Sequence, residues 1–176
     1  MALTLSLVPL CAQTTKTVTK QPNVWGKLKW GMTLAQAKSA YSGGSFEVVP
    51  NKEISRPSIS IKGVEIGDRT VDVHVTAANG STIDNITLDP NLDSQHGGTP
   101  SSRQEAFDEF KTRLIEKYGA PTNEGPKPKL PAGDETLTTV IWVRPSTTIH
   151  LYWSEREYQL GWVLVEYTPA NRKNGM

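Results

Sequence analysis

The first half of the chain contains three stretches in which apolar and polar residues alternate. Valines alternate with polar residues over 71–76, which predicts a half-buried β-strand. Residues 58–66 form a strand before it, and the shift in their apolar phase around Gly63 indicates a β-bulge. The Asn-Gly pair at 79–80 is typical of a tight hairpin and leads into a third strand over 81–88. We therefore expect a three-stranded antiparallel meander here.

A short helix is predicted just before this meander. Thr33 and Gln36 stand three residues apart, the spacing at which a capping box satisfies two backbone amides at a helix start. Apolar residues then recur at helical spacing, and Gly43-Gly44 ends the pattern. Two Trp-Gly pairs precede the helix, and we expect Trp25 and Trp30 to anchor this N-terminal approach to the domain.

A longer helix is predicted in the second half of the chain. Ser102 and Glu105 have the spacing of its capping box, and Gly119 is typical of its end. Glu109 and Arg113 stand four residues apart on the outer face, where an ion pair adds a little stability. The core stripe consists of large side chains at helical spacing, namely Phe107, Phe110, Leu114 and Tyr118.

Three further strands follow a loop rich in Pro, Gly and Lys over 121–135. They are predicted over 135–145, 147–153 and 159–169. The last of these is apolar on both faces, which is typical of a central strand. The order helix, strand, strand, strand thus occurs twice.

The repeated element order predicts an α+β fold of two tandem units. Each unit is a helix plus a three-stranded antiparallel meander, with the helices packed on one face of the sheet or sheets. The strands of the two units either stay separate or merge into one larger sheet. The predicted organisation is a signal peptide at 1–13, linkers at 14–23 and 91–101, units at 24–90 and 102–169, and a tail at 170–176.

The N-terminus has the shape of a secretory signal peptide. An apolar run over 3–10 is followed by small residues, with a cleavage site near Ala12 or Gln13. The alternatives are a lipoprotein anchored at Cys11 and an ordinary first strand. Cleavage would remove Cys11, the only cysteine of the chain, and would place the mature protein in the periplasm or outside the cell.

Composition narrows the range of partners. The 176 residues carry a net charge of +1 without a basic stripe, so we expect no nucleic-acid binding. The apolar run at the N-terminus is far shorter than the ~20 residues that a membrane-spanning helix needs, so we expect no membrane span.

Motifs for catalysis or for cofactors are not recognisable in the sequence. The chain has no nucleophile elbow and no phosphate-binding loop. His74 and His150 lie in predicted strands, while His96 lies in a loop near Asp93 at no known metal spacing. We therefore expect no metal, no cofactor and no enzymatic activity. An enzyme of unrecognised type stays open as the second alternative to the leading prediction.

Aromatic side chains are the candidates for a binding surface. Most of the three tryptophans in the last three strands, Trp142, Trp153 and Trp162, are expected in the core. Strand alternation places Tyr152 and His150 together on the opposite face from their apolar neighbours. Tyr152, with Trp142 or His150, is therefore a candidate patch for a protein or a glycan, and Trp25 is a further candidate for exposure.

The run Trp30-Gly31-Met32-Thr33, followed by Ala37, Tyr41 and a meander, resembles a known family. It is similar to small bacterial outer-membrane-assembly lipoproteins of the SmpA/OmlA group and to the β-lactamase-inhibitor-like tandem fold. The resemblance implies binding roles in the cell envelope. The leading prediction is a non-catalytic extracytoplasmic protein whose sheet surface or 121–135 loop binds a protein partner. The alternative is a secreted ligand- or glycan-binding protein that uses the sheet aromatics.

Overall fold

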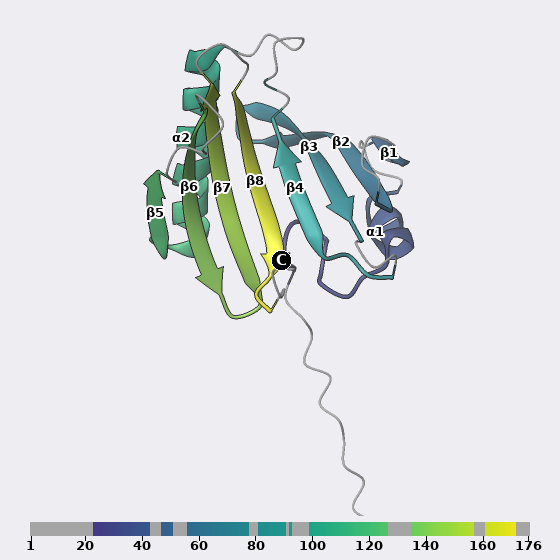
Figure 1. Ribbon diagram of the computed structural model, residues 1–176. Helices are drawn as coiled ribbons and strands as arrows, with labels where there is room; N and C mark the ends of the chain where they lie inside the picture. Colours follow the sequence, from purple (N-terminus) through teal and green to yellow (C-terminus); the bar gives the residue numbers. More distant parts are fainter. Residues whose placement is uncertain are drawn as a thin grey trace, which may run out of the picture.

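The computed structural model describes residues 23–42, 47–50, 56–77, 81–90, 92, 99–126, 135–156 and 161–171. Two helices and eight strands lie within these residues (Figure 1). In chain order they are α1 (Leu34–Tyr41), β1 (Glu47–Pro50), β2 (Ser58–Ile66), β3 (Arg69–Thr76), β4 (Asn85–Asp89), α2 (Pro100–Tyr118), β5 (Asn123–Pro126), β6 (Glu135–Arg144), β7 (Thr147–Arg156) and β8 (Trp162–Pro169).

All eight strands belong to one antiparallel sheet in the order β1-β2-β3-β4-β8-β7-β6-β5. The prediction of two tandem helix-plus-three-strand units is therefore wrong. The halves join where β4 pairs with β8, through Ile86 with Tyr167, Thr87 with Glu166, and Leu88 with Val165. Each of these strands would otherwise end its half of the sheet with unpaired backbone groups. Their pairing removes two edges and creates one continuous core.

The sheet also contains two short strands that sequence reasoning missed. β1 pairs with β2 at one edge, and β5 pairs with β6 at the other. β5 occupies the start of the predicted 121–135 loop, and residues 127–134 of that loop lie outside the described residues. Both edge strands are four residues long and contain a proline, which is one way in which proteins limit edge-to-edge association.

One core lies between the helices and the sheet. α2 crosses behind β6 and β7 in Figure 1, and Phe107 packs against Trp153 with their ring centroids 5.5 Å apart. Ala37 and Tyr41 of α1 belong to the same buried cluster as residues of β2, β3, β4, β6, β7 and β8. The largest buried side chain is Trp142, whose indole Nε1 donates to the Gly119 carbonyl at 2.9 Å and ties β6 to the end of α2.

The start of α1 confirms its predicted cap, whereas the start of α2 does not. Thr33 Oγ1 accepts from the Gln36 amide at 3.2 Å, and Gln36 Oε1 accepts from the Thr33 amide at 2.9 Å. The capping box of α2 instead consists of Thr99 and Ser102, with Pro100 in the first turn. Proline suits that position because the amide it lacks has no partner within the helix.

Several local predictions agree with the structure. β2 has the predicted bounds, and its pairing with β3 shifts between Ile61 and Val64, which confirms the bulge at Gly63. β8 is central, as its two apolar faces predict. The predicted signal peptide, most of the 14–23 linker, the Asn-Gly pair at 79–80 and His96 lie outside the described residues.

The N-terminal approach to α1 forms a turn that we call the Trp25 loop, residues 24–28. The Val24 amide donates to the Leu28 carbonyl, and the Leu28 amide donates to the Trp25 carbonyl, both at 2.8 Å. Trp25 stacks on Tyr41 with the rings 6.4 Å apart. Trp30 Nε1 donates to Thr147 Oγ1 at 3.0 Å. These contacts hold the approach against α1 and against β7.

Candidate functional site

Neither described helix covers the second face of the sheet, which we call the open face. It faces the viewer in Figure 1, with α2 behind it. Strand register places one continuous row of polar residues across it. Directly paired side chains along this row are Ser60, His74, Thr87, Glu166 and His150, from β2, β3, β4, β8 and β7. The junction of β4 and β8 is what brings the two halves of this row together.

Tyr152 lies at the centre of a hydrogen-bonded network on the open face. Its hydroxyl donates to Glu166 Oε2 at 3.2 Å and lies 2.8 Å from His150 Nδ1. Because the hydroxyl has one proton, which it gives to the carboxylate, His150 Nδ1 is the donor in the second bond. Asn85 Nδ2 donates to the other carboxylate oxygen of Glu166. Thr87 Oγ1 donates to Asn85 Oδ1 at 2.9 Å.

This network fixes the protonation of the tyrosine. Burial raises the pKa of Tyr152, and the negative charge of Glu166 and its hydrogen bond raise that pKa further. The phenol therefore remains protonated and acts as a hydrogen-bond donor at neutral pH. A neutral, fixed donor is suited to orienting a partner and is a poor general base.

Apolar side chains extend the open face around Tyr152. Trp162 packs edge-on against Tyr152 with the ring centroids 6.0 Å apart. Among the described residues, three large hydrophobic side chains are exposed, and two of them, Trp162 at 39% and Val143 at 50%, lie on this face. Trp162 is thus an exception to the expectation that most of the strand tryptophans lie in the core, because its strand turns this side chain away from the helices.

The other half of the open face is polar and acidic. Asp72 of β3 and Asp89 of β4 are directly paired, and Lys62 forms an ion pair with Asp72. On the same face, Ser60 Oγ lies 2.9 Å from His74 Nδ1. Asp72 itself is buried and paired, so the half-buried carboxylates of Asp89 and Glu166 are the acidic groups of the open face nearest to the aromatic residues.

Trp142 does not join Tyr152 and His150. It is fully buried and lies on the helix-covered face, where it pairs with Ile149 across β6 and β7. Its inclusion in the candidate patch was wrong because a residue in register with Ile149 must point toward the core. The residue that sits beside Tyr152 is Trp162 of β8.

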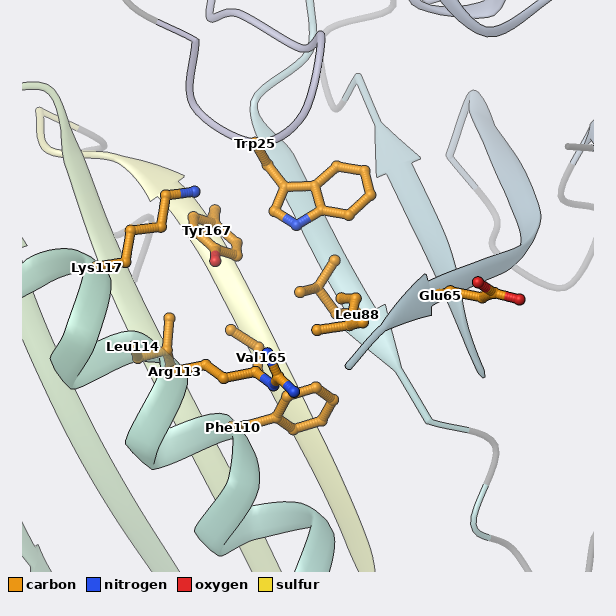
Figure 2. Close-up of a pocket in the computed structure, with 10 residues that line it drawn as sticks. Trp25, Glu65, Leu88, Phe110, Arg113, Leu114, Lys117, Val165 and Tyr167 are labelled. Atoms are coloured by element: carbon orange, nitrogen blue, oxygen red, sulfur yellow. The ribbon is translucent and has the colours of Figure 1, made fainter. Parts of the chain in front are cut away.

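Trp25 is half-buried and roofs a separate pocket of about 190 Å³ on the helix-covered side. Figure 2 shows its indole above Leu88 and Val165 of the sheet, with Leu114 and Phe110 of α2 at the side. The residues that line this pocket include no histidine. Two distinct candidate sites thus emerge, one on each face of the sheet.

Neither site has the donor set of a metal centre. Within the ranges that the structure describes, no group of three or more His, Cys, Asp or Glu could hold a metal ion. Neither described helix is long and apolar enough to cross a membrane. Comparisons of the chain with protein-family models, with curated proteins and with solved structures found no match. The family resemblance therefore stays a prediction.

Sequence reasoning found Tyr152 and His150 but missed their partners. Glu166 and Asn85 come from β8 and β4, and their link depends on the pairing that joins the two halves. Strand alternation alone could have placed Trp162 on the same face of β8 as Glu166. Only the order of the strands in the sheet reveals that this face adjoins Tyr152.

Proposed function

We propose that the protein is an extracytoplasmic, non-catalytic binding protein that engages a protein partner through its open face. The exposed Trp162 beside Tyr152 is the observation that carries the proposal. Exposed aromatic residues that a fold does not use in its core mark interaction surfaces. Export is supported by the apolar run and small residues at the N-terminus of the sequence.

A protein partner fits the arrangement of this surface. The centres of protein interfaces are rich in Trp and Tyr, and their rims are polar. Here Trp162 and Tyr152 contact each other, and the polar residues of β3 and β4 lie on the far side of β8 from Tyr152. We therefore expect a partner with an apolar pocket for Trp162 and a basic rim opposite Asp89 and Glu166.

The network around Tyr152 supports binding over catalysis. The Tyr152 hydroxyl bonds to both His150 and Glu166 along a sheet face, which holds their polar atoms in fixed directions. Such fixed groups orient a partner at no further cost in conformational freedom. The raised pKa of Tyr152 also keeps its proton in place.

The experiment is affinity capture from envelope extract with the purified chain, followed by binding measurements on the recovered partner. Trp162→Ala is the test variant. Ile115→Ala is the matched control, because Ile115 is equally exposed at 39% but lies on α2. Loss of a central aromatic anchor costs about 2 kcal/mol or more, so we expect the dissociation constant to rise about thirtyfold for Trp162→Ala and to be unchanged for Ile115→Ala.

Equal affinity of Trp162→Ala and wild type would reject the open face as the binding surface. A chain that recovers no protein but binds a polysaccharide through Trp162 would replace the proposal by the glycan-binding alternative. Weaker binding at higher salt would support the basic rim expected on the partner, since exposed charges are screened.

A further inference from the structure

The pocket under Trp25 has an apolar interior and a cationic mouth. Leu88 and Val165 form its floor, and Phe110 and Leu114 of α2 form one wall. All four are buried core residues, and Trp25 closes the top (Figure 2). The volume of about 190 Å³ exceeds the ~150 Å³ of an apolar cavity that takes up one benzene ring. The pocket is thus large enough for one small ring.

Two cations of α2 line the same pocket. Arg113 Nε pairs with Glu109 at 3.1 Å, which leaves further guanidinium N–H groups as donors. Lys117 has no ion-pair partner among the described residues, and its ammonium lies 5.1 Å from the centroid of the Tyr118 ring. Glu65 is the acidic residue in the lining, and Figure 2 shows its carboxylate pointing away from the pocket. Glu109 offsets the charge of Arg113, so Lys117 is the cation that makes the mouth attractive to an anion.

The Trp25 indole adds a hydrogen-bond donor to the pocket. Figure 2 shows the nitrogen of the Trp25 indole on the ring edge that faces the pocket. Among the described residues this N–H group has no hydrogen-bond partner. Tryptophan offers a donor and no acceptor, so Trp25 adds an N–H donor to those of Arg113 and Lys117 in the pocket lining.

We propose that this pocket binds a small aromatic monocarboxylate, with the ring between Trp25 and the Leu88–Val165 floor and the carboxylate against Lys117 and Arg113. The apolar interior selects the ring, and the cationic mouth selects the anion over a neutral or positive analogue. The pocket opens on the helix-covered side of the sheet, so the proposal does not depend on the open face.

The probe is 3-phenylpropionate, titrated into the full chain and followed by the indole N–H resonances in NMR spectra and by calorimetry. Trp25→Phe identifies the Trp25 resonance. We expect saturable binding with a dissociation constant of about 1 mM, since so small a ligand offers few contacts. The neutral amide and the matching amine should bind about fivefold or more weakly, because each lacks the anionic group.

Two variants test the two parts of the pocket. Lys117→Gln should weaken binding of the acid about two- to fivefold and leave binding of the amide unchanged. Lys38→Gln on α1 is the matched control and should change the affinity for neither ligand. Ile66→Trp fills the pocket from a half-buried position and should abolish binding, with the folded state checked by thermal unfolding.

Equal binding of acid and amide, or of wild type and Lys117→Gln, would overturn the proposal. So would an unperturbed Trp25 resonance at about 10 mM ligand, where a site with the expected affinity is mostly filled. Neither result would affect the proposed function, since that test uses Trp162 and a protein partner.

Discussion

Gly26 of the Trp25 loop provides the sharpest test of how this loop is held. Its backbone has φ of +51°, and a Cβ built on it would lie 2.3 Å from Tyr41 Oη. An alanine here incurs about 1–2 kcal/mol for the left-handed backbone. It also displaces the Tyr41 hydroxyl, which accepts from the Lys27 amide at 3.0 Å, at about 0.5–1.5 kcal/mol. Gly26→Ala should therefore destabilise the fold by about 1.5–3.5 kcal/mol.

Gly31 supplies a matched control on the same approach to α1. Its φ is +83°, but a Cβ built there would meet no atom within 4 Å. Gly31→Ala thus carries the backbone cost alone, about 1–2 kcal/mol. Tyr41→Phe removes the oxygen that a Cβ at Gly26 would meet. In that background Gly26→Ala should become no more costly than Gly31→Ala, which gives a coupling between the two sites.

The assay is urea and thermal unfolding of the four single and double variants. For a domain of this size, 1 kcal/mol shifts the midpoint by about 2–4 °C, so Gly26→Ala should lower it by roughly 3–14 °C. The reasoning fails if Gly26→Ala is no more destabilising than Gly31→Ala. It also fails if the effects of Gly26→Ala and Tyr41→Phe are additive.

Two further outcomes follow from the described geometry. Burial raises the pKa of Tyr41, Tyr152 and Tyr167 above 10.0, so above that pH the unfolded chain loses phenol protons before the folded chain does. The contribution of these tyrosines to the free energy of unfolding should be fully present below pH 10 and fall as the pH rises from 10 toward the folded pKa values. The fall should be shallower in Tyr152→Phe. Urea unfolding at several pH values would measure it, and a flat profile would refute this. Thr139 Oγ1 is buried under the open face without a hydrogen-bond partner in the described part of the chain. The isosteric Thr139→Val should therefore raise the free energy of unfolding by up to about 1 kcal/mol. Urea unfolding measures this change, and a marked loss of stability would contradict the reasoning.

The elements of the fold were largely predictable because their signals are local. Alternation of small apolar residues located β2 and β3, and the capping box of Thr33 and Gln36 located α1. The start of α2 was missed because Ser102 resembles a cap when read with Glu105. In the structure, Thr99 is the N-cap residue, and Ser102 is the residue three positions later that completes its capping box.

The arrangement of the elements was not predictable, because it depends on contacts between residues far apart in sequence. Asn85 and Glu166 are 81 residues apart, and their bond exists only because β4 and β8 pair. Nothing local distinguishes that pairing from two separate sheets. The short strands β1 and β5 lack alternation of their own and form because a neighbouring strand supplies their partners.

β8 contributes residues to both candidate sites that a reading of single strands did not assign to them. Its apolar character on two faces predicted a central strand, which it is, but did not show what each face contacts. Instead, Val165 and Tyr167 line the pocket under Trp25, while Trp162 and Glu166 belong to the open face. The first pair is required for folding, since helix packing buries it. Trp162 is covered by neither described helix, and its exposure is the observation on which the proposed binding through the open face rests.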